Sequence, residues 1–80
     1  MNKVILTFFL KKLNKEVDLE VSTNSTIGEV VSIICENYRL GDIKSVDVFA
    51  LHLGRVLSFD ETFEEAGVWS GSKLVLNQVK

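Results

Sequence analysis

The sequence predicts an α+β fold in which one amphipathic helix packs across a mixed sheet of four or five strands. Two patterns carry this prediction. Apolar residues recur at helical spacing between Ile27 and Tyr38, and the segments on both sides of that stretch alternate apolar and polar residues with a period of two. In chain order the patterns give strand, strand, helix, strand, short strand, strand. We expect residues 1–80 to form a single domain, because no linker, repeat or low-complexity segment interrupts them.

The predicted helix is the element around which the other segments are placed. Thr26 and Glu29 have the spacing of a capping box, in which the Thr hydroxyl accepts from the Glu amide and the Glu carboxylate accepts from the Thr amide, so the helix begins at Ile27. Its polar back carries Glu29, Ser32 and Glu36. Its apolar stripe consists of Ile27, Val30, Val31, Ile34, Cys35 and Tyr38. Burial of this stripe contributes on the order of 10 kcal/mol before entropy is subtracted.

Two segments ahead of the helix are predicted to pair as a hairpin. Between Lys3 and Lys11 the even positions are apolar, and Glu16–Ser22 alternates strictly, with three acids on one face. Leu13–Lys15 supplies the turn between them. The residues expected to face the core are Val4, Leu6, Phe8, Leu10, Val17, Leu19 and Val21.

The segments after the helix are predicted to complete the sheet. Val46–Leu51 is expected to be a strand in which Asp47 faces water, which places Phe49 and Leu51 on the outer face. Val56–Leu57 forms a short strand after the Gly54-Arg55 turn, residues 60–67 form a short helical turn, and residues 73–76 form the last strand. The inward-facing residues of these segments are Val46, Val48, Ala50, Phe63, Leu74 and Leu76.

Charge and composition exclude several classes of function. The chain has nine Lys and Arg against eleven Asp and Glu, a net charge of −2, and its basic residues are scattered. It therefore lacks the basic patch that binds nucleic acid or an anionic membrane. No apolar run approaches the ~20 residues of a membrane span, and no cleavage pattern follows residues 4–10. We expect a cytoplasmic protein, and its single Cys cannot form an internal disulfide.

No motif for catalysis, cofactor binding or metal binding is recognised. Cys35 lies on the apolar stripe of the helix, where burial suppresses the thiolate, and the only His, His52, is expected in a distant turn. A lone His cannot build a zinc site, and the acidic pair Glu64–Glu65 has no phosphate-binding or metal motif beside it. We predict that the protein is not an enzyme and has no catalytic, cofactor-binding or metal-binding residues.

Five fragments resemble ubiquitin in order and spacing, and together they cover the chain: Val17–Val21, Thr26–Val30, Gly54–Leu57, Thr62-Phe63 and Lys73–Leu76. The resemblance implies the ubiquitin-like β-grasp fold, with the N-terminal hairpin and the last strand central in the sheet. Ubiquitin and the sulfur carriers of this fold act through a Gly-Gly tail that must thread a narrow channel of an activating enzyme. The sequence here ends Asn77-Gln78-Val79-Lys80. Because Gly-Gly is absent from these residues, a transferable modifier or sulfur carrier is the disfavoured alternative function.

Among ubiquitin-like proteins that are not conjugated, the chain is similar to the YukD/EsaB family, small cytosolic components of type VII (WXG100/ESX) secretion systems of Gram-positive bacteria. Three features carry this resemblance: a free-standing domain expected to end just past its last strand, the register Asp18-Leu19-x-Val21-Ser22, and the run Ala66-Gly67-Val68-x-x-Gly71-Ser72-x-Leu74-x-Leu76. The family often has Asp where this chain has Ser72. It implies an accessory or regulatory component that binds protein parts of the secretion machinery. A third reading, a fragment of a longer protein, is disfavoured by the initial Met1.

The sheet face away from the helix is the predicted partner-binding surface. If the even positions of the first strand point inward, its odd apolar residues point outward, and in a β-grasp sheet the first, last and third strands are neighbours. Large apolar side chains gathered on an open face commonly mark a protein interface. The predicted partner-binding residues are Ile5, Phe9, Phe49, Leu51 and Val75. Long side chains such as Lys3, Lys73 and Arg55 lying over the patch are one alternative, and a homodimer through the same face is another.

Overall fold

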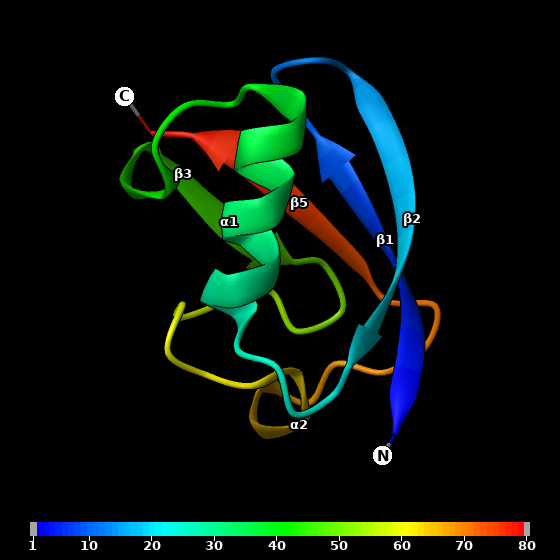
Figure 1. Cartoon of the computed structure of the whole chain (residues 1–80). Coiled ribbons are helices and arrows are strands. Elements are labelled where there is room, and N and C mark those ends of the chain that lie inside the picture. Colours follow the sequence, from blue (N-terminus) through cyan, green and yellow to red (C-terminus); the bar gives the residue numbers. More distant parts are fainter. Residues whose placement is uncertain (1, 80) are drawn as a thin grey trace.

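The computed structural model describes residues 2–79, and its elements follow the predicted order with one short addition, η1 (Figure 1). The helical elements are α1 (Ile27–Tyr38), the 3-10 turn η1 (Ile43–Ser45) and α2 (Phe63–Ala66). The strands are β1 (Lys3–Leu10), β2 (Lys15–Ser22), β3 (Val46–Ala50), β4 (Arg55–Val56) and β5 (Lys73–Gln78).

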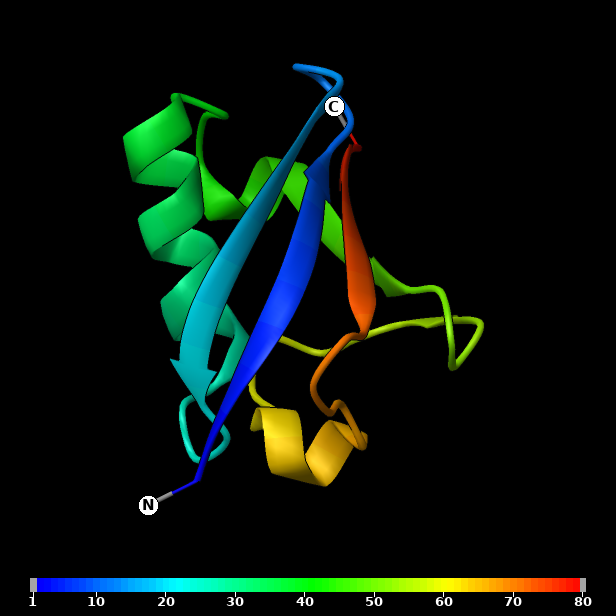
Figure 2. The ribbon, with the colours of Figure 1, turned by 90° about the vertical axis from the view of Figure 1, so that its right-hand side faces the viewer.

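The five strands form one mixed sheet in the order β2-β1-β5-β3-β4. β1 and β5 run parallel, and the other neighbours run antiparallel. The last strand of the chain thus lies between the first and the third, with the helix across the sheet. Figure 2 shows α1 on one side of the sheet, while the opposite side carries no helix. This arrangement confirms the predicted α+β fold with one main helix.

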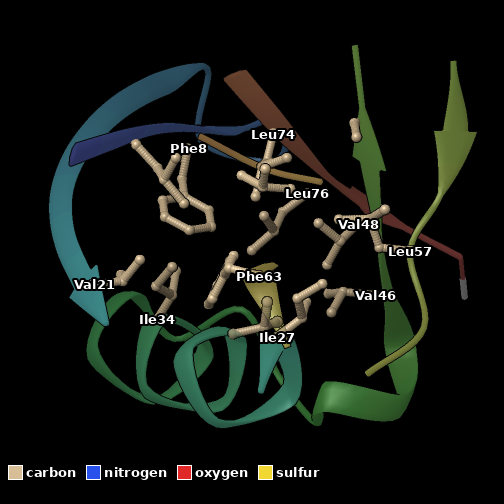
Figure 3. Close-up of a cluster of buried hydrophobic side chains, with 14 of the residues drawn as sticks. Phe8, Val21, Ile27, Ile34, Val46, Val48, Leu57, Phe63, Leu74 and Leu76 are labelled. Carbon is tan, nitrogen blue, oxygen red and sulfur yellow. The ribbon is translucent and has the colours of Figure 1, made fainter. Parts of the chain in front are cut away.

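The core lies between α1 and the covered face of the sheet. Figure 3 shows Ile27 and Ile34 of the helix directed toward the same interior as Phe8. All the residues expected to face inward in the segments after α1 are buried, as are Leu6, Phe8, Leu10 and Val21. The remaining predicted core residues of the hairpin, Val4, Val17 and Leu19, are half-buried and pack against the cluster.

Both helices begin with the same capping box. At α1, the Glu29 amide donates to the Thr26 hydroxyl at 3.2 Å and the Thr26 amide donates to the Glu29 carboxylate at 2.8 Å, as predicted. At α2, Thr62 and Glu65 make the equivalent pair of bonds at 3.0 Å each. The two helix starts lie side by side, since Thr26 and Thr62 form an isolated antiparallel bridge. Each start thereby satisfies amides that a helix leaves unpaired.

The third and fourth strands differ from the prediction at their ends. β3 ends at Ala50 rather than Leu51, because residues 51–54 turn the chain back toward β4. The short strand is Arg55–Val56 rather than Val56–Leu57. Leu57 has left the strand, yet its amide donates to the Val48 carbonyl at 2.8 Å and its side chain is buried.

The first, second and last strands are also shifted at their ends. β1 ends at Leu10 and β2 begins at Lys15, because the turn occupies residues 11–14 and Asn14 adopts a left-handed φ of 52°. β5 continues beyond Leu76 to Gln78, because β3 pairs with it as far as Val46. The alternation of apolar residues stops before Asn77 and Gln78, so the pattern predicted a strand that is two residues too short at this end.

Candidate binding surface

An apolar row crosses the open face of the sheet, one residue from each of four adjacent strands. Phe9 of β1 is the register partner of Val75 on β5, Val75 is the partner of Phe49 on β3, and Phe49 is the partner of Val56 on β4. Register partners project from the same face of a sheet, so the four side chains adjoin one another. We call this set, Phe9, Val75, Phe49 and Val56, the apolar row. Val56 is 51% exposed and the other three are half-buried.

Polar residues border the apolar row on both sides along the strands. On one side, Thr7 donates through its hydroxyl to the Asp18 carboxylate at 2.8 Å, and the Lys73 ammonium bonds the Glu16 carboxylate at 2.7 Å. On the other side, Asn77 and Asp47 are register partners on β5 and β3. An apolar centre with a polar rim is the anatomy of a protein interface.

Two of the predicted partner-binding residues lie outside the apolar row. Leu51 follows β3 in the turn, is 52% exposed, and donates through its amide to the Lys73 carbonyl at 3.3 Å, which holds it at the border of the row. Ile5 is also exposed, but it pairs with Glu20, and Thr7 separates it from Phe9 along β1. The structure therefore brings together Phe9, Phe49 and Val75, with Leu51 at their edge and Ile5 apart.

Several exposed apolar residues were not among the predicted partner-binding residues, and two of them, Val56 and Trp69, bear on the choice of surface. Val56 belongs to the apolar row, but its face could not be assigned without knowing that it pairs with Phe49. Trp69 is 60% exposed, and its ring meets that of His52 edge-on with centroids 4.9 Å apart. His52 lies in the turn of residues 51–54, as the sequence predicted, and its Nε2 is 3.2 Å from the Gly67 carbonyl oxygen.

The titratable side chains of residues 2–79 include one buried thiol and no cluster of the metal-binding kind. Cys35 is buried, and burial, reinforced by the Asp42 carboxylate, raises the pKa of its thiol, which disfavours the nucleophilic thiolate. Within residues 2–79, no three His, Cys, Asp or Glu side chains gather as metal ligands would. Over the same residues, no helix has the length and apolar character needed to cross a membrane.

The comparisons with known proteins bear on the fold. Neither the protein-family models nor the curated proteins give a match. Among solved structures, the chain is similar to a ubiquitin of Caldiarchaeum subterraneum, with a TM-score of 0.81 and 26% identity over 96% of this chain and 94% of that one. It is also similar to the ubiquitin-like domain of Plasmodium falciparum Dsk2, with a TM-score of 0.78 and 17% identity over 96% and 99% of the two chains. A ubiquitin-like domain of an Arabidopsis thaliana protein gives a TM-score of 0.80 at 18% identity, covering all of this chain and 81% of that one. The chain therefore has the ubiquitin-like β-grasp fold.

Proposed function

We propose that the chain is a non-catalytic, cytoplasmic binding module that docks, through the apolar row and Leu51, on a protein component of a type VII secretion system. The observation that carries the proposal is the apolar row, four adjoining apolar side chains on a sheet face that α1 leaves uncovered. Leaving such side chains in water costs free energy that a partner covering them recovers. The secretion system as the setting comes from the sequence resemblance to the YukD/EsaB family.

The two motifs behind that resemblance occupy defined places in the fold. The register Asp18-Leu19-x-Val21-Ser22 is the second half of β2, and the run from Ala66 to Leu76 joins the end of α2 to β5. In that run Gly67 and Gly71 have φ of 79° and 89°, a left-handed region that favours glycine. The same run contains Val75, which lies at the centre of the apolar row. One of the two motifs behind the resemblance therefore overlaps the proposed docking surface.

The test is export of a WXG100-type substrate by cells whose own copy of this chain is replaced by a variant. Phe49→Asp and Val56→Asp each place a carboxylate in the apolar row, and Val56 is exposed enough for the fold to tolerate the change. We expect both variants to fold and to lower export roughly tenfold or more, as loss of a central interface residue does.

The matched control is a charge change on the opposite side of the molecule. Glu36→Lys lies on the exposed back of α1 and should leave export unchanged. Glu29→Lys is unsuitable, because the Glu29 carboxylate accepts from the Thr26 amide in the capping box and its loss would weaken the helix. Normal export by folded Phe49→Asp and Val56→Asp proteins would refute the proposed docking surface.

A further inference from the structure

The outer edge of β2 carries backbone groups that no neighbouring strand uses. β2 is the terminal strand of the sheet, and in an antiparallel pair the residues that exchange hydrogen bonds recur at every second position. The Thr23 amide donates to the Asn2 carbonyl at 3.0 Å, one step beyond the end of the β1–β2 ladder. The odd-numbered residues of β2 therefore bond β1. The amides and carbonyls of Glu16, Asp18 and Glu20 point away from the sheet.

The two edges of the sheet differ in length. At the opposite end of the sheet, β4 contains only Arg55 and Val56, so it offers an incoming strand almost nothing to pair with. β2 is eight residues long. An edge of that length is a template for the addition of a further strand unless something covers it.

A shallow apolar groove runs beside this edge, between β2 and α1. It encloses about 290 Å³, and its apolar lining is Leu19, Val21, Val30 and Ile33. Ile33 is 56% exposed even though it lies on a helix whose remaining apolar residues are buried or half-buried. A strand added to β2 would direct every second side chain toward this groove and the others toward the open face of the sheet.

The side chains of β2 determine which charge favours the pairing of an added strand. Glu16, Asp18 and Glu20 project from the open face of β2. Glu16 pairs with Lys73 and Asp18 accepts from the Thr7 hydroxyl, whereas Glu20 makes no side-chain hydrogen bond or ion pair with the described residues. A second copy added through its own β2 would set acids against acids, and like charges opposite one another destabilise strand pairing. Lys or Arg at those positions would pair with them instead.

We propose that the outer edge of β2 binds an extended segment of another protein in which Lys or Arg alternates with a branched apolar residue. The backbone of the segment bonds Glu16, Asp18 and Glu20, its basic side chains face their carboxylates, and its apolar side chains enter the groove against Ile33. This surface adjoins the apolar row, since Glu16 is the register partner of Phe9, but its backbone edge and groove are distinct from the row and go beyond the proposed function. Ile33 lines only the groove and Val56 belongs only to the apolar row, so each site has a residue that can be changed without altering the other.

The test uses three capped nine-residue peptides and NMR spectra of the isotopically labelled protein. One peptide alternates Lys and Val, a second alternates Lys and Ser, and a third alternates Glu and Val. We expect the Lys/Val peptide to shift the amide resonances of Glu16, Asp18, Glu20 and Ile33 and to bind roughly tenfold tighter than either of the others. Equal binding of the Lys/Ser peptide would overturn the proposal, because attraction by charge alone explains it. Shifts confined to the apolar row would also overturn it.

Variants separate the contributions of the β2 backbone amide, the Glu20 carboxylate and the apolar groove to peptide binding. Glu20→Pro and Glu20→Ala remove the same carboxylate, but only the Pro variant removes the outward-facing amide, so it should bind the Lys/Val peptide more weakly than Glu20→Ala does. Ile33→Ser should weaken binding, whereas Val56→Ser, which alters the apolar row, should not. If Glu20→Pro fails to fold, a Lys/Val peptide N-methylated at alternate residues replaces it, and unchanged affinity of that peptide refutes strand addition. Dimerisation of the free protein that Glu20→Ala strengthens would likewise refute the proposal, because the occupant would then be a second copy.

Discussion

Gly28, the second residue of α1, is the position where helix propensity and packing oppose each other most directly. Its amide donates to the Phe59 carbonyl at 3.0 Å. A Cβ added at Gly28 would lie 3.0 Å from that carbonyl oxygen and 3.1 Å from the Phe59 Cβ, closer than ordinary van der Waals contact. The segment that carries Phe59 cannot easily withdraw, because the Glu61 carbonyl beside it accepts from the Ile27 amide at 2.8 Å.

The magnitudes favour the packing penalty. Ala in place of Gly inside a helix gains about 1 kcal/mol, and less at this position in the first turn. Overpacking a closely fitted site costs about 1–3 kcal/mol. Any retreat of the Phe59 segment weakens two backbone hydrogen bonds, each worth about 1 kcal/mol. We therefore expect Gly28→Ala to lower the free energy of unfolding by about 1–2 kcal/mol, which for a chain of this length lowers Tm by roughly 4–8 °C per kcal/mol.

Urea and thermal unfolding followed by far-ultraviolet circular dichroism measure this effect. Ser32→Ala is the matched control, since Ser32 is exposed on the same helix and its replacement changes propensity without packing. The control should be slightly more stable than the wild type, by less than about 1 kcal/mol. A Gly28→Ala protein as stable as the Ser32→Ala protein would show that the Phe59 segment yields freely, and the reasoning from close contact would be wrong.

Two further predictions concern Cys35 and Glu61. Cys35→Ala should cost about 1 kcal/mol of stability, as removal of a small buried group does, and thiol reagents should label the native protein far more slowly than the denatured one; rapid labelling of the native protein would contradict this. A hydrogen bond from Arg55, and then one from the Ser58 amide, lower the pKa of Glu61. A carboxyl with a lowered folded pKa adds stability above its unfolded pKa and loses that contribution as pH falls through the folded pKa. The difference in free energy of unfolding between the wild type and Glu61→Gln should thus be largest at pH 7 and should shrink toward zero in acid. A difference that does not change with pH would show that these hydrogen bonds do not lower the pKa of Glu61.

Local patterns were enough to predict the helix and the buried faces of three strands, but not the core residues Leu40, Leu57, Ala66 and Val68, which lie in loops and at element ends. The start of α1 at Ile27 follows from Thr26 and Glu29 alone, because the two residues of a capping box are only three positions apart in the sequence. The buried faces of β1, β3 and β5 follow from alternation, because a sheet covered on one side requires it.

Features that depend on pairing between distant segments were not predictable in the same way. Val56 joins the apolar row only through its pairing with Phe49, and no local pattern specifies that partner. Ile33 lies beside the apolar stripe of α1, but its exposure depends on where β2 leaves the helix uncovered. Leu51 was assigned to the third strand because apolar residues continue through it, whereas the turn that ends the strand is set by the return to β4.

The place of β5 in the sheet has a consequence for how the protein is made. A chain emerges from the ribosome at about 5–20 residues per second, so the hairpin and α1 are available well before β5. Until β5 arrives, β1 and β3 each lack a neighbour, and contacts such as Phe8 with Leu74 cannot form. Val75 arrives with the same strand and completes the apolar row. A nascent chain therefore presents no complete apolar row, and binding of a partner through the proposed docking surface would be confined to molecules whose synthesis has passed β5.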